Sequence, residues 1–100
     1  MSYRFGDFVF ESDNGLTKAG IPVELEPKAA KFLGFLLENS GRLVTRDELC
    51  EHIWDDRAIS DAAISTQIRA IRKALGDDRA TQKFVKTHPR RGFSVRPETF

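Results

Sequence analysis

The amino-acid sequence predicts an α+β domain in which an N-terminal antiparallel β-sheet precedes three helices and a C-terminal β-hairpin. Three observations predict this order. Turn signals separate short aromatic-rich runs over residues 1–25, apolar residues recur at helical spacing over 26–76, and two extended runs flank a Pro-Arg-Arg sequence within 83–96. A chain of 100 residues has the length of one domain with one hydrophobic core, so 1–100 is expected to fold as a unit.

The segment 1–25 is expected to form three or four short antiparallel strands with aromatic side chains on the buried face. Gly6-Asp7 and Asp13-Asn14-Gly15 supply turn signals, and Ala19-Gly20 supplies another. Apolar residues lie between these turns, as expected for strands that bury one face. They are Phe5, Phe8, Phe10, Leu16, Val23 and Leu25.

The first helix is expected to begin at Pro27, because proline suits the first helical position, where the N–H that it lacks would have no partner anyway. Asn39-Ser40 ends the apolar periodicity, and Gly41 is expected to cap the helix in the left-handed conformation. A short extended piece over 42–44 follows. The apolar stripe of this helix consists of Ala29, Phe32, Leu33, Leu36 and Leu37.

Thr45 and Glu48 predict the start of the second helix, because Thr-x-x-Glu is a capping box in which each side chain pairs with the other residue's backbone N–H. The helix is expected to end near Trp54, since the residues that follow carry no apolar repeat. The residues expected to face inward are Leu49, Cys50, Ile53 and Trp54.

The third helix, 61–75, is expected to have one apolar seam and one polar face. Ser60 or Asp61 caps its start and Gly76 ends it. At about 100° per residue, the seam covers roughly 60° of the helix surface. It consists of Ile64, Ile68, Ile71 and Leu75. The face opposite and its flanks carry Thr66, Gln67, Arg69, Ala70, Arg72 and Lys73.

This polar face has the mixture of side chains that a helix needs in the DNA major groove. Small residues let the backbone approach, Gln and Arg can read base edges, methyl groups can meet thymine, and flanking cations can meet phosphates. The alternative is an ordinary surface helix, which is also polar outside and apolar inside.

The C-terminal hairpin strengthens the interpretation as a DNA-binding protein. Its tip carries Arg90 and Arg91, with no acidic residue within six positions on either side. Arginine suits a narrow minor groove, where the negative potential is strongest. Lys86 and Thr87 are expected to hold adjacent phosphates, and the alternative is a solvated loop.

The charge is segregated along the chain. The net charge is only +1, but residues 1–61 hold 7 Lys and Arg against 12 Asp and Glu, a net of −5. Residues 62–100 hold 9 against 3, a net of +6. An acidic part joined to a basic part predicts one face that meets an anionic partner.

Catalytic and metal chemistry find little support in the sequence. There is no Gly-rich phosphate loop and no nucleophile elbow. Cys50 and His52 lie about 200° apart on one helix and cannot share a tetrahedral metal. We therefore expect no enzyme activity, no cofactor, no metal and no small-molecule substrate. The single cysteine and the lack of a long apolar stretch favour a reducing, cytoplasmic compartment.

Three stretches together resemble the effector domain of OmpR/PhoB-type winged helix-turn-helix transcription regulators. They are LEPKAAKFLGFLLENSGRLVTRDEL, SDAAISTQIRAIRKALGDD and FVKTHPRRGFSV. The Pro-Arg-Arg-Gly wing is most similar to the CadC-like, one-component branch. The resemblance implies sequence-specific binding of double-stranded DNA, with recognition helix 61–75 in the major groove and wing 86–92 at the minor groove.

Residue roles follow from the resemblance by matched position. Gln67, Arg69 and Arg72 correspond to DNA-contacting positions of the recognition helix, Thr87 to a backbone contact, and the wing arginine to the minor-groove reader. Pro89 stands where many response regulators carry that arginine, so either Arg90 or Arg91 fills the role. The polymerase-contacting loop of relatives corresponds to a segment that includes Asp55, Asp56, Arg57 and Ala58.

Departures from the family pattern are also expected to matter. Ala62, Ala63 and Ala70 replace long polar residues, which makes base readout depend more on methyl contacts, and Glu26 weakens the first helix cap. The chain is expected to be the N-terminal domain of a longer regulator, monomeric alone and paired head-to-tail on DNA. The alternative is a winged-helix module that binds another protein.

Overall fold

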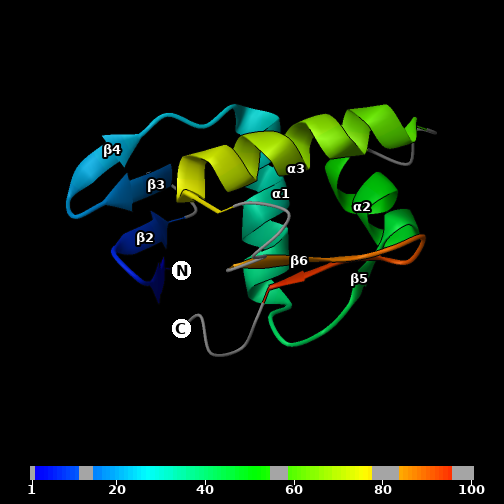
Figure 1. The fold of residues 1–100 in the computed structure, drawn as a ribbon, viewed down its shortest axis with the longest axis horizontal. Helices are drawn as coiled ribbons and strands as arrows, with labels where there is room; N and C mark the ends of the chain where they lie inside the picture. The colour runs from blue at the N-terminus through cyan, green and yellow to red at the C-terminus, as the bar shows by residue number, and fades with distance from the viewer. Residues whose placement is uncertain (1, 12–14, 55–58, 78–83, 96–100) are drawn as a thin grey trace.

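The computed structural model describes residues 2–11, 15–54, 59–77 and 84–95. It contains a four-stranded sheet, three helices and a three-stranded sheet (Figure 1). The elements are β1 (Ser2–Phe5), β2 (Phe8–Glu11), β3 (Gly15–Lys18), β4 (Ile21–Val23), α1 (Pro27–Glu38), β5 (Val44–Thr45), α2 (Arg46–Ile53), α3 (Asp61–Leu75), β6 (Val85–His88) and β7 (Gly92–Val95). The predicted α+β order is confirmed.

Each sheet is antiparallel. The N-terminal sheet has the order β1-β2-β3-β4, and the second sheet has the order β5-β7-β6. The hairpin β6–β7 with its tip, 85–95, is called the wing below. Because β7 is the central strand, the wing is joined through β5 to the connection between α1 and α2. Figure 1 shows α3 lying across α1, with β6 running beneath α3 toward the side of α2.

The core lies where the helices and both sheets meet. The apolar stripe of α1 and the seam of α3 are buried as predicted, because helical spacing places those residues on one side. Phe5 and Phe8 from the N-terminal sheet pack on Phe84 just before β6, with ring centroids 5.6 and 5.9 Å apart. Helix α1 packs on β7 through Phe32, whose ring centroid lies 5.9 Å from that of Phe93.

The C-terminus of α1 differs from the prediction. The helix ends at Glu38 with Asn39 as its C-cap, and the Asn39 side-chain amide donates to the carbonyl of Phe35 at 2.8 Å. Gly41 does adopt a positive φ of +83°, but beyond the cap. Its N–H donates to the carbonyl of Val95 at 3.1 Å, so the glycine joins this connection to β7.

The capping box of α2 is confirmed. The Glu48 N–H donates to the Thr45 hydroxyl at 3.2 Å, and the Glu48 carboxylate accepts from the Thr45 N–H at 3.2 Å. Arg42 also donates to both oxygens of this carboxylate at 2.9 Å, and these bonds, with the Thr45 N–H, hold the pKa of Glu48 at about 2. Leu49 and Ile53 are buried, whereas Cys50 and Trp54 are only half-buried.

Within the described part of the chain, no helix combines the length and the apolar character that crossing a membrane requires.

Candidate nucleic-acid interface

Helix α3 is capped at both ends. Because its apolar seam is buried, polar side chains on its opposite side face outward. The Ser60 hydroxyl accepts from the Ala63 N–H at 3.2 Å, and Gly76 ends the helix with a φ of +67°. Arg69 and Lys73 are exposed, as predicted. Thr66 is exposed as well, and its hydroxyl donates to the carbonyl of Ala62 at 2.9 Å, which leaves its methyl group and oxygen lone pairs for other contacts.

Gln67 and Ala70 lie closer to the core than the sequence suggested. Both are half-buried, and Ala70 packs against the hydrophobic core. The side-chain oxygen of Gln67 is buried and has no hydrogen-bond partner among the described residues. A buried amide oxygen without a partner is costly, and a donor brought by a ligand would satisfy it.

The placement of Arg72 on the exposed side of α3 is wrong. Arg72 is 8% exposed, and its guanidinium donates to the carbonyl of Val85 at 3.2 Å and to the Thr87 hydroxyl at 2.6 Å. On a helical wheel Arg72 falls beside the polar face, but the wing covers that side of the helix. Arg72 and Thr87 therefore form a buried contact that joins α3 to the wing.

The wing tip carries the two arginines on a tight turn. The Arg91 N–H donates to the carbonyl of His88 at 2.9 Å, which closes a four-residue β-turn with Pro89 at its second position. Arg90 adopts a φ of +63°, which costs about 1 kcal/mol for a residue with a side chain. Arg90 and Arg91 are both exposed, as is Lys86. The turn thus fixes the backbone from which two cations project.

Two hollows lie between α3 and the wing. The lining of one, of about 560 Å³, includes Arg69, Arg72 and Lys73 of α3, Asp77 just after the helix, and Thr87 of the wing. The other, of about 290 Å³, lies between the first turn of α3 and the wing tip, and its lining includes Arg46, Asp61, Arg90 and Arg91. The exposed cations of α3 and the wing therefore border one concave surface.

Sequence reasoning missed Arg46 and Asp77. Arg46 begins α2 and bonds the carboxylate of Asp61 at 2.7 Å, which links the starts of two helices. Asp77 directly follows Gly76, the predicted helix end, but it is 8% exposed and accepts hydrogen bonds from the backbone N–H groups of Phe84 and Val85. Neither contact has a local sequence signal, because each joins segments that are distant along the chain.

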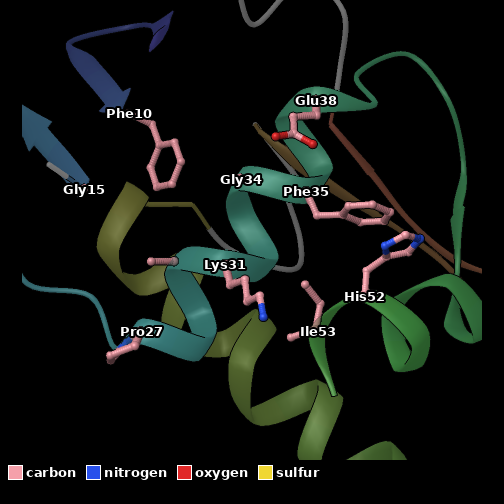
Figure 2. A pocket seen from close by; sticks show the side chains of 10 residues that line it. Phe10, Gly15, Pro27, Lys31, Gly34, Phe35, Glu38, His52 and Ile53 are labelled. Atoms are coloured by element: carbon pink, nitrogen blue, oxygen red, sulfur yellow. The ribbon is translucent and has the colours of Figure 1, made fainter. Parts of the chain in front are cut away.

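The expected loop residues Asp55, Asp56, Arg57 and Ala58 lie outside the described residues. On another side of the domain, a hollow of about 690 Å³ lies between the N-terminal sheet, α1 and α2 (Figure 2). In it the His52 ring stacks on Phe35 with centroids 4.6 Å apart. Among the described residues, no cluster of three or more His, Cys, Asp or Glu is suited to hold a metal ion.

His88 lies in the wing beside several cations. It is half-buried, and its Nε2 is 2.8 Å from the Ser94 hydroxyl across the hairpin. Burial lowers the pKa of His88 below its ordinary value, and the positive charges of Lys86 and Arg91 lower it further. Arg46, Asp61 and Arg90 line the same hollow.

The lowered pKa makes the stability of the wing depend on pH. Protonation of His88 is less favourable in the folded domain than in the unfolded chain. The contribution of neutral His88 to the free energy of unfolding is therefore complete above the unfolded pKa and is lost as pH falls through the folded pKa. From about pH 7.5 to about pH 5, the free energy of unfolding is expected to fall more in the wild type than in His88→Gln. Chemical denaturation at several pH values measures this. His52→Gln is the matched control, and an equal fall in wild type and His88→Gln would contradict the assignment.

An N-terminal sheet, three helices with an exposed polar third helix, and a β-hairpin packed beside it define a winged helix-turn-helix domain. The family described as "Transcriptional regulatory protein, C terminal" matches residues 20–95. The chain belongs to this family, in agreement with the OmpR/PhoB-type resemblance of its sequence.

Named relatives support the same placement. The transcriptional activator CadC of Escherichia coli K12 is 30% identical over 92% of this chain, which spans 18% of that protein. The response regulator DrrB, an OmpR/PhoB homologue of Thermotoga maritima, is 32% identical with a TM-score of 0.83, over 95% of this chain and 44% of that one. The DNA-binding domain of E. coli CadC is 28% identical with a TM-score of 0.75, over 92% and 88%.

Proposed function

We propose that this domain binds double-stranded DNA in a sequence-specific manner, with α3 in the major groove and the wing at the adjacent minor groove. The observation that carries this proposal is the shared concave surface, bordered by exposed cations from both elements. Apart from Asp61, the first residue of α3, the carboxylates of residues 1–61 come before these two elements in the sequence. A duplex placed on α3 and the wing would therefore meet positive charge although the whole chain is nearly neutral.

On α3, Arg69 is proposed as the principal base-reading residue, because it is exposed and can donate two hydrogen bonds to guanine. Gln67 is proposed to turn its amide toward a base edge, where the amino group of a base would donate to its otherwise unpartnered oxygen. Thr66 and Ala70 would contribute methyl contacts. Phosphate contacts are assigned to the exposed side chains of Lys73 and Lys86. Arg72 and Thr87, which bond each other, would support the wing from behind this surface.

Arg90 and Arg91 are proposed to serve the minor groove. Both are exposed on the turn, and arginine is favoured where a narrow groove concentrates negative potential. The positive φ of Arg90 places a strained residue at the tip, and such strain is common where a side chain must be held for a ligand.

Several finer features are proposed for the regulator in which this domain acts. The domain would function in the cytoplasm, where DNA and RNA polymerase are available, as part of a one-component regulator. The segment containing Asp55, Asp56, Arg57 and Ala58 would contact polymerase. The domain would be monomeric alone and occupy direct repeats as a head-to-tail pair. No enzymatic role is proposed.

Selection of bound duplexes from a random pool tests the function. Repeated rounds of capture on the domain, followed by sequencing, are expected to enrich one short motif or its direct repeat. A pool that stays random, with no retained binding, would contradict sequence-specific recognition. The selected duplex and a shuffled version of it then serve as the matched pair for the variants below.

Arg69→Ala is expected to erode discrimination. Loss of a bidentate base contact costs about 1–3 kcal/mol of preference for the correct base, so the ratio of affinities for the selected and shuffled duplexes should fall roughly 5- to 150-fold. Lys73→Ala is the control, because an exposed phosphate contact should weaken both duplexes alike. Titration of both duplexes in fluorescence anisotropy gives the ratio. An unchanged ratio for Arg69→Ala would remove it from base readout.

A further inference from the structure

The outer edge of β6 is held by side chains from the end of α3. β6 is an edge strand, and an edge strand presents N–H and C=O groups that no neighbouring strand pairs. At Val85 both groups have side-chain partners. Its N–H donates to the Asp77 carboxylate at 3.0 Å, and its C=O accepts from Arg72 at 3.2 Å. The Asp77 carboxylate also accepts from the Phe84 N–H at 2.9 Å.

Asp77 is itself held in place by α3. It follows Gly76, the left-handed cap, and its N–H donates to the carbonyl of Arg72 at 2.8 Å. The carboxylate therefore projects from a fixed position at the end of the helix. Asp77 and Val85 are 8% and 0% exposed, so these hydrogen bonds are shielded from water.

From this geometry we infer that Asp77 is a positioning residue for DNA binding, which fixes the wing relative to α3 so that both elements meet one duplex together. The inference rests on the proposed function. Asp77 faces the start of β6 with its carboxylate, and the wing tip lies at the other end of that strand. Its effect on DNA would thus pass through the wing backbone.

The energetic reason is that α3 and the wing act as two linked binding elements. When one has bound, the second finds its groove at a high effective concentration only if the link between them is rigid and correctly placed. A wing that moves relative to α3 must be ordered on binding, and that entropy reduces the affinity that Arg90 and Arg91 contribute. The wing arginines should therefore be worth less when Asp77 is lost.

A double-mutant cycle tests this coupling. The cost of replacing Arg90 and Arg91 by alanine is measured by anisotropy on one selected duplex, first with Asp77 present and then in Asp77→Ala. The wing variant is expected to lose about 100-fold in affinity when Asp77 is present and less than about 10-fold in Asp77→Ala. Asp77→Asn should restore most of the coupling, because both backbone N–H groups donate to one carboxylate oxygen, which an amide oxygen can replace.

The control is Ser60→Ala, which removes the cap at the other end of α3. It destabilises the helix by about 1 kcal/mol, but it should leave the cost of the wing variant unchanged. Circular dichroism verifies folding of each variant. If Asp77→Ala does not fold, Asp77→Glu replaces it in the same cycle, since it keeps the charge but displaces the carboxylate by one methylene.

The outcomes distinguish a failure of the positioning role of Asp77 from a failure of the proposed DNA binding. Equal costs of the wing variant with and without Asp77 in folded proteins would overturn the positioning role, as would an Asp77→Asn variant that behaves like Asp77→Ala. Neither result would affect the proposed function. A wild-type domain that fails to bind the duplex at all would instead overturn the proposed function.

Discussion

Replacement of both Arg90 and Arg91 by alanine is expected to weaken binding to every duplex by about 100-fold, because each arginine is expected to contribute about 1.4 kcal/mol, near the low end of the range for arginine contacts with DNA. Both side chains are exposed on a turn that the Arg91 N–H closes onto His88. The loss should be similar for the selected and shuffled duplexes, since minor-groove shape is read with little base specificity. The dependence of affinity on salt should also become less steep.

The matched control for the wing variant is Arg4→Ala combined with Lys31→Ala. It removes the same charge from exposed positions on β1 and α1, outside α3 and the wing. If only net charge mattered, the two double variants would lose affinity equally. The single variants Arg90→Ala and Arg91→Ala then show which arginine enters the groove. Unchanged binding by the wing double variant would exclude the wing from the interface.

Gly92→Ala is expected to have the largest effect on stability, a loss of about 3 kcal/mol or more in the free energy of unfolding. Gly92 lies on the central strand β7, paired with Thr45 on one side and His88 on the other. Its φ is +153°, and an added Cβ would overlap the carbonyl oxygen of Val44 and lie 3.0 Å from the Cα of Thr45. Because both contacts are backbone, β5 would have to separate from the wing.

Gly20→Ala separates the two causes of this loss of stability, which are the positive φ and the overlap of the added Cβ with β5. Gly20 has a φ of +83°, but an added Cβ would meet nothing within 4 Å. It should therefore cost only about 1 kcal/mol, the penalty of a left-handed backbone. Denaturant unfolding of both variants measures the difference. Equal losses would mean that the close approach of β5 to Gly92 contributes nothing.

The sequence predicted the elements whose signals are local. The seam of α3, the capping box at Thr45 and the cap at Gly76 depend on residues within a few positions of each other, and the structure confirms all three. The left-handed cap predicted at Gly41 was wrong because Asn39 caps α1 with its own side chain. Gly41 has the expected conformation for a different reason, its bond to Val95.

The candidate site was predicted less completely, because its geometry depends on contacts between distant segments. A helical wheel places Arg72 among polar residues but cannot show that the wing covers it. The sequence pattern marks Gly76 as a helix end but gives no sign that Asp77, the next residue, bonds Phe84 and Val85, which lie 7 and 8 positions further along the chain. The structure does expose Arg69, Lys73, Lys86 and the two tip arginines, as predicted.

The salt dependence of DNA affinity tests the central claim most directly. If α3 and the wing neutralise phosphates, the logarithm of the association constant should fall linearly with the logarithm of salt concentration, with a slope of about −4 to −6. The measurement is an anisotropy titration of the wild-type domain on the selected duplex at several salt concentrations. A slope near zero, or no binding at low salt, would contradict DNA binding through this surface and favour a module that binds another protein.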